Sequence, residues 1–191
     1  MEIKRFSQNG TPVLSLDGPM IELRTRVCEI RFPARVNSHW VIDQINQGNG
    51  VLDSLAKPEF KMIVPRIPFS VMTQVLDLFY KTMLGNKLME LEVWITLDND
   101  QWGIYIPEQQ NGQLRIKNIE SITADRFIVA IIHSHGAYPP IFSTTDNNNE
   151  IFGFVYGVVG SLLTGAPDFN FRFGWNREFI KLEVGDVLAI N

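Results

Sequence analysis

FIVAIIHSHGAYPPIFSTTD, residues 127–146, carries the strongest structural signals in this chain of 191 residues. Its first part is an almost unbroken apolar run, which is typical of a central strand buried on both faces. A loop with two prolines follows. The final Ser143-x-x-Asp146 predicts the start of a helix, with Ser143 as the N-cap and Asp146 in a capping-box-like position. We therefore predict a buried strand that leads through a loop into a helix.

The flanking segments extend this pattern in both directions. The residues after the helix start predict a second buried strand at 152–163 and a closing hairpin or edge pair at 169–175 and 178–188. Upstream, apolar residues spaced three and four apart predict an amphipathic helix that starts at Pro68 and ends at Gly85. Between helix and central strand, alternation predicts a hairpin of 88–98 with 101–107, and a further strand with its loops at 111–122.

The first part of the chain has a different character. Residues 1–61 are rich in strand and turn signals, and 18–36 alternates well enough for one long strand or a hairpin pair that Pro33 ends. We expect a β-rich region at 1–61 and a second domain at 62–191. The single cysteine, Cys28, sits in the alternating segment, where a small core residue is a better interpretation than a nucleophile.

Composition limits the function classes. Hydrophobic residues make up 45% and charged residues 20%, as in ordinary globular proteins. A net charge of -4 gives no electrostatic reason to expect nucleic acid or an anionic membrane as partner. The longest apolar stretch, 151–163, is too short to span a bilayer, and the start of the chain lacks a signal-peptide pattern. One cysteine excludes an intrachain disulfide and fits a cytoplasmic location.

His133 and His135 suggest a metal site. They are two residues apart at the end of a strand, so both imidazoles point to the same side. Asp146 adds a carboxylate. Zinc accepts both ligand types readily, so the ligand chemistry favours zinc, with iron and manganese as open alternatives. Three protein ligands leave a fourth position for water, which is the arrangement of catalytic rather than structural zinc. The alternative is a polar loop that binds no metal.

A metal hydrolase also needs a group that carries a proton. Glu90, on the more polar face of the predicted strand at 88–98, is our candidate, and Glu92 on the same face is the competing choice. Ser143 lies next to the predicted site, where its hydroxyl could stabilise an oxyanion. The alternative is that Ser143 acts only as an N-cap.

The motif His133-Ser134-His135, seven residues, Ser143-x-x-Asp146 resembles the JAMM motif of the JAB/MPN metalloprotease family, in which a glutamate lies upstream. The resemblance covers residues 65–165. Gly136 is a departure, because many members have proline there. More narrowly, the chain is similar to the bacterial PRTRC system A group, on the segments 17–33, 133–150 and 89–110. In the last of these, Glu90 precedes the turn residue Asp98 by eight positions, which favours Glu90 over Glu92.

The resemblance implies a cytidine-deaminase-like α/β fold, with a central mixed sheet flanked by helices. It implies zinc-dependent hydrolysis of isopeptide or peptide bonds at the C-terminal tail of a ubiquitin-like protein, with ThiF/E1-like and E2-like proteins of the same gene cluster as partners. It also implies His133, His135 and Asp146 as ligands, Glu90 as general base and Ser143 as oxyanion helper. Two alternatives stay open: a catalytically silent scaffold that binds partner proteins, and a zinc hydrolase of small amino-acid conjugates.

Overall fold

The computed structural model describes residues 11–15, 18–33, 46–48, 51–52, 59–85, 89–111, 116–118, 120–122, 126–150, 153–175 and 178–190. The chain divides into two compact units, Met1–Pro65 and Arg66–Asn191. The first unit extends a few residues beyond the boundary expected after residue 61. In class, the described chain is mixed α/β with mostly sheet and few helices. None of the helices in these described ranges has the length and apolar character needed to cross a bilayer.

The first unit is built on a five-stranded sheet. Its strand order is β4-β1-β2-β3-β5. The strands are β1 (Thr11–Ser15), β2 (Gly18–Arg24), β3 (Cys28–Pro33), β4 (Val51–Leu52) and β5 (Glu59–Met62). β2 and β3 pair antiparallel, so the segment 18–36 contains a hairpin pair and not one long strand. β3 ends at Pro33, as predicted. The Cys28 side chain is fully buried, and burial raises the pKa of its thiol to about 12, which confirms a core role.

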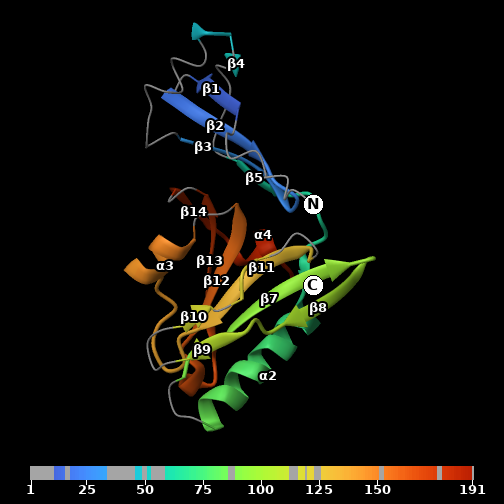
Figure 1. The fold of residues 1–191 in the computed structure, drawn as a ribbon, viewed down its shortest axis with the longest axis vertical. Coiled ribbons are helices and arrows are strands. Elements are labelled where there is room, and N and C mark those ends of the chain that lie inside the picture. Colours follow the sequence, from blue (N-terminus) through green and yellow to red (C-terminus); the bar gives the residue numbers. More distant parts are fainter. Residues whose placement is uncertain are drawn as a thin grey trace. The chain divides into compact units, whose positions relative to one another are not determined.

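The second unit is built on a six-stranded sheet (Figure 1). Its order is β14-β13-β12-β11-β7-β8. The strands are β7 (Glu92–Asp98), β8 (Gln101–Tyr105), β11 (Ile128–Ser134), β12 (Phe154–Gly160), β13 (Asp168–Trp175) and β14 (Glu178–Leu182). β11 pairs with β12 in parallel and with β7 antiparallel, and every one of its residues is buried. The predicted central strand is therefore confirmed.

Side-chain alternation gives this sheet two different faces. Ile131 lies opposite Tyr156 on β12 and Trp94 on β7, and these three form part of a buried cluster. His133 follows two residues after Ile131, so it lies on the same face at the end of the strand. Ile132 lies opposite Gly157 on the other face, where a side chain at Gly157 would collide with Phe171. The apolar packing of both faces fixes the register that orients His133.

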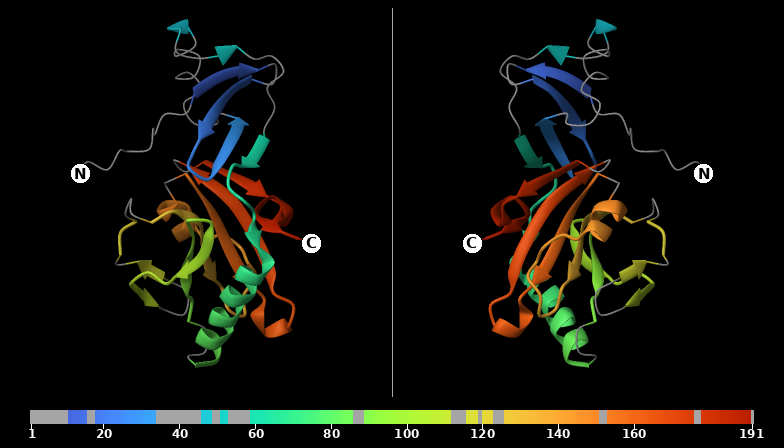
Figure 2. Two further views of the ribbon diagram at one scale, coloured as in Figure 1. Left: turned by 90° about the vertical axis from the view of Figure 1, so that its right-hand side faces the viewer. Right: turned by 90° about the vertical axis from the view of Figure 1, so that its left-hand side faces the viewer.

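The helices and small sheets complete the unit. α2 (Phe69–Gly85) has the predicted bounds and contacts β8 and β6 (Ile67–Pro68), which pairs with β15 (Leu188–Ala189). The α2 side chains that are buried follow the predicted spacing: Val71, Met72, Val75, Phe79 and Met83. The loop between β12 and β13 carries the short helix η1 (Leu162–Thr164), which lies at the lower end of the orange strands in Figure 2.

The strand predicted with its loops at 111–122 is present as the short β10 (Ile116–Asn118), which pairs antiparallel with β9 (Gln109–Asn111). One predicted segment differs from the structure. The last predicted strand, 178–188, stops at Leu182 and continues as α4 (Val184–Val187). A capping box between Glu183 and Asp186 starts α4, and this local signal overrides the strand-like apolar pattern around it.

Candidate metal centre

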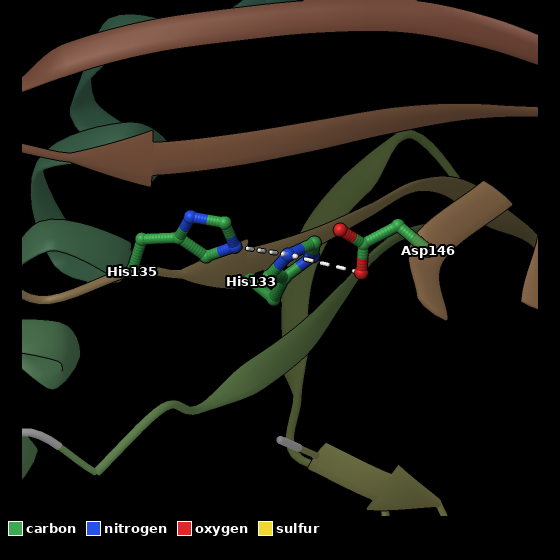
Figure 3. A group of neighbouring side chains, drawn as sticks. All are labelled: His133, His135 and Asp146. Atoms are coloured by element: carbon green, nitrogen blue, oxygen red, sulfur yellow. Dashed lines mark hydrogen bonds and ion pairs between the residues drawn. The ribbon is translucent and has the colours of Figure 1, made fainter. Parts of the chain in front are cut away.

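The two histidines come from the end of β11. His133 is 7% exposed and is the last residue but one of the strand, whereas His135 is the first residue after it. Their Nε2 atoms lie 3.2 Å apart, so both rings point toward one position (Figure 3). The strand end therefore offers two imidazole nitrogens at a common site, as the two-residue spacing requires.

Asp146 comes from α3 (Thr144–Asn149), which begins after the loop that follows β11. Its Oδ1 atom lies 3.5 Å from Nε2 of His133. The other oxygen, Oδ2, accepts a hydrogen bond of 2.5 Å from the backbone N–H of Ser143. One ligand atom from each of the three residues fits within 4.8 Å of the others. The capping box therefore fixes the carboxylate with one oxygen aimed at the histidines.

The loop after β11 sets the tautomer of His135. Its Nδ1 atom lies 3.2 Å from the carbonyl oxygen of Pro139. A carbonyl oxygen can only accept, so Nδ1 carries the hydrogen, and in the neutral ring Nε2 is then the nitrogen with the lone pair. Histidine ligands in metal sites are oriented by the same type of bond from the second ring nitrogen. His135 is thus held in the form that binds a metal through Nε2.

The same loop is fixed by backbone bonds to the end of β12. Ser161 N–H donates to the carbonyl of Tyr138, and Leu162 N–H donates to the carbonyl of Gly136. Gly136 has a φ of 56°, which glycine adopts without strain and which the ring of proline forbids. Gly160 lies so close to the Tyr138–Pro140 backbone that a Cβ atom there has no space. Position 136 therefore favours glycine and excludes proline, and position 160 requires glycine.

The charge state of His133 suits a metal. Burial lowers the pKa of His133 to about 4, against the opposing effect of the Asp146 carboxylate, so its ring is neutral at pH 7. Two histidine nitrogens bound to one tetrahedral zinc at about 2.05 Å would lie roughly 3.3 Å apart. The observed separation of 3.2 Å matches that value. The donor set of two imidazoles and one carboxylate thus fits zinc.

Glu90 lies close to these groups but outside the strand in which it was expected. β7 begins at Glu92. The N–H of Leu91 donates to the Ser134 hydroxyl, and the carbonyl of Leu91 accepts the backbone N–H of Ser134. The Glu90 side chain is 8% exposed. Burial, with a smaller contribution from the negative charge of Asp146, raises its pKa to about 7. No residue in the described ranges donates a hydrogen bond to its carboxyl group.

Glu92, the competing choice, has a different environment. Its Oε1 atom accepts a 2.8 Å hydrogen bond from the indole N–H of Trp94. Trp94 is part of the buried cluster beneath the sheet face, so the bond ties the Glu92 carboxylate to the core. A carboxylate that is engaged in this way is a weaker candidate for proton transfer than the buried Glu90 carboxyl.

Ser143 is the N-cap of α3. Its Oγ atom accepts a 3.2 Å hydrogen bond from the N–H of Asp146, and the side chain is otherwise exposed. The capping prediction is confirmed. The hydroxyl hydrogen is not donated to any residue in the described part of the chain, so it stays available to a ligand.

Sequence reasoning overlooked a second group of residues at the site. Arg172 on β13 binds Asn147 and Glu150, and its guanidinium lies on the ring of Phe142. The segment FNFRFGW, residues 169–175, was interpreted only as a closing strand. The one available signal was an arginine at an alternating position between phenylalanines, which on a buried strand requires a partner.

Comparisons with known proteins give little further information. No protein-family model matches this chain, and no curated protein matches it at a significant level. Among solved structures, the chain is similar to the solution structure of a protein from Salinibacter ruber (strain DSM 13855). That match has 18% sequence identity and a TM-score of 0.35, and it covers 58% of this chain and 86% of the other.

Proposed function

We propose that the unit Arg66–Asn191 is a zinc-dependent hydrolase of the JAB/MPN type. Its substrate would be the isopeptide or peptide bond at the C-terminal tail of a ubiquitin-like protein. One observation carries the proposal: ligand atoms of His133, His135 and Asp146 converge within 4.8 Å. The spacing of these residues along the chain is that of the JAMM motif.

The sheet is compatible with this proposal. A JAB/MPN core would have β11 at its centre, with the ligands at the end of β11 and at the start of α3. Here β11 lies between β7 and β12, and α3 follows it directly in the chain. The cytoplasmic location and the E1-like and E2-like partners belong to the same proposal, since they depend on the resemblance to the PRTRC system A group.

The residues around the ligands have properties that hydrolysis needs. Zinc, when bound, supplies a Lewis acid that polarises a carbonyl group and lowers the pKa of water. Glu90 has a pKa raised to about 7, so its carboxyl can both accept and release a proton near neutral pH. Ser143 can donate its hydroxyl hydrogen to a developing oxyanion. No nucleophilic cysteine is involved, since Cys28 is buried in the other unit.

The first test is a metal measurement on the purified chain. We expect about one zinc per chain in the wild type and a loss of most of it in His135→Ala. An equal zinc content in both proteins, or none in either after zinc is added, would contradict the metal centre. The His135 side chain is only partly buried, so we expect His135→Ala to fold. Circular dichroism of the same samples checks this.

The second test addresses the substrate. The zinc-loaded chain is incubated with a ubiquitin-like protein fused through its C-terminal tail to a reporter, and with small N-acyl amino acids. Cleavage of the fusion alone supports the proposed substrate class. Cleavage of the small conjugates alone favours the amino-acid-conjugate hydrolase. Zinc binding without either reaction favours a scaffold that binds partner proteins.

A further inference from the structure

The helix that carries Asp146 cannot be stable through its own sequence. α3 has six residues, TTDNNN, and none of them is buried. Threonine, asparagine and aspartate are weak helix formers, and isolated helices shorter than about 12 residues are marginal in water. The capping box stabilises only its first turn. Contacts with the rest of the unit must therefore hold α3 in place.

Arg172 provides these contacts at the second half of the helix. Its Nη1 atom donates to Oδ1 of Asn147 at 2.7 Å, and its Nε atom donates to Oε2 of Glu150 at 2.6 Å. Asn147 is in α3, and Glu150 is the residue that caps it. Hydrogen bonds from an ionised donor such as the Arg172 guanidinium are about twice as strong as bonds between neutral groups. The bonds to Arg172 thus fasten the helix to the centre of β13.

Arg172 also contacts the segment before the helix. Its Cζ atom lies 3.6 Å from the ring centroid of Phe142 and 4.0 Å from that of Phe179. Phe142 precedes the N-cap Ser143, and its ring lies edge-on to His133 with centroids 6.5 Å apart. The guanidinium therefore touches the chain on both sides of Asp146, at Phe142 before it and at Glu150 after it.

Arg172 itself is firmly placed. It is 8% exposed, and it lies opposite Tyr156 of β12 and Lys181 of β14 in the interior of the sheet. Its Nη2 atom is buried and has no hydrogen-bond partner among the described residues. A buried charge of this kind costs free energy of folding. An apolar residue at position 172 would pack on the same aromatic rings without that cost. This cost indicates a role beyond packing.

We infer that Arg172 is a positioning residue of the metal centre, which holds α3 so that the Asp146 carboxylate faces His133 and His135. The inference rests on the proposed function. Lysine cannot replace arginine here, because one ammonium group cannot bind Asn147 and Glu150 in fixed directions while lying flat on two aromatic rings. Arg172 would not touch a substrate.

The metal-free protein gives the first test. Backbone NMR chemical shifts of residues 144–149 are compared between the wild type, Arg172→Met and the control Arg126→Met. Arg126 is a matched control, since its Nη1 atom lies 2.6 Å from Glu120 and its Cζ atom lies 3.6 Å from the ring centroid of Tyr105. We expect helical shifts in the wild type and control and their loss in Arg172→Met. Helical shifts in Arg172→Met would overturn the inference, whether or not the wild type binds zinc.

Zinc affinity, measured by competition with a chromophoric chelator, gives the second test. We expect Arg172→Met to bind zinc about 10- to 100-fold more weakly than the wild type, as for other residues that orient metal ligands. The zinc affinity of Arg126→Met should match that of the wild type, and Arg172→Lys should bind zinc almost as weakly as Arg172→Met. Wild-type affinity in Arg172→Met would overturn the inference and leave the proposed function intact, whereas absence of zinc binding in the wild type would overturn both.

Arg172→Met leaves the Glu150 carboxyl buried without its partner, so the variant could fail to fold. Asn147→Val then replaces it in both tests, because valine offers no acceptor to Arg172 and has a helix propensity close to that of asparagine. This variant removes one of the two hydrogen bonds from Arg172 to α3 and leaves the 2.6 Å pair with Glu150 intact. We expect weaker helical shifts and a smaller loss of zinc affinity. Unchanged shifts and unchanged affinity in Asn147→Val would contradict the positioning role.

Discussion

The Nδ1 atom of His135 lies 3.2 Å from the carbonyl oxygen of Pro139, four residues further along the same loop. The bond closes the loop on the histidine, and backbone bonds from Ser161 and Leu162 attach the loop to the end of β12. The orientation of one proposed ligand therefore depends on the close approach of two backbone segments, with Gly160 at their contact.

Gly160→Ala should disturb this ligand without touching it. A Cβ atom at position 160 collides with the backbone of Tyr138, Pro139 and Pro140, which cannot move as a flexible side chain would. We expect a loss of about 1–3 kcal/mol in the free energy of unfolding and zinc binding weakened by about tenfold or more. Chemical denaturation and chelator competition measure the two effects. Gly185→Ala is the control, since a Cβ atom there meets no neighbour. Equal zinc affinity in both variants would refute the link between loop and ligand.

Glu90→Gln should separate metal binding from turnover. The substitution keeps the size of the side chain but removes the group that exchanges a proton, so we expect kcat to fall by about 100-fold or more with zinc content unchanged. Glu92→Gln is the matched control, and it should keep most of the activity because Trp94 can still donate to its amide oxygen. Near-normal turnover in Glu90→Gln would transfer the proposed role to Glu92. The assay uses the ubiquitin-like fusion that the substrate test identifies.

The stability of the metal-free protein should depend on the ionisation of Glu90. Its folded-state pKa of about 7 lies above the ordinary 4.5, so between these pH values the folded state binds more protons than the unfolded state. Stability therefore decreases as the pH rises through this window. Glu90→Gln removes the effect, and its stability relative to the wild type should rise between pH 5 and pH 8 by up to about 3 kcal/mol. His133 and Glu150 titrate in both proteins, so their contributions largely cancel.

Urea denaturation of both proteins across this pH range measures the difference. A stability difference that stays constant with pH would mean that the Glu90 carboxyl is solvated rather than buried, and would weaken its assignment as the proton carrier.

Ser134→Ala should destabilise the fold next to Glu90. The Ser134 hydroxyl is buried and accepts the N–H of Leu91, the residue after Glu90, at 3.1 Å. Its removal leaves a buried N–H without an acceptor, which costs about 1–3 kcal/mol. Thr73→Ala in α2 is the control, because its exposed hydroxyl bonds only to the preceding helical turn and its loss should change stability by less than about 0.5 kcal/mol. Thermal denaturation compares them. A Ser134→Ala protein as stable as the control would show that water replaces the bond.

Much of the local structure followed from the sequence. The apolar run before His133 predicted a central strand, the capping pattern of Ser143 and Asp146 predicted a helix start, and the bounds Pro68 and Gly85 predicted α2. Each of these signals depends on neighbouring residues along the chain, since side-chain period and helix capping are local properties. Where two local signals competed, as at Glu183 and Asp186, the apolar pattern was the misleading one.

By itself, the sequence thus determined which residues could become ligands: their types, their spacing and the elements that bear them are all local. Only the tertiary structure decided what holds and tunes them. The Glu90 pKa depends on burial and on the charge of Asp146. The His135 tautomer depends on a loop anchored to β12, and the position of Asp146 depends on an arginine from β13. These effects arise from desolvation and from contacts between residues far apart in the chain, which no local pattern encodes.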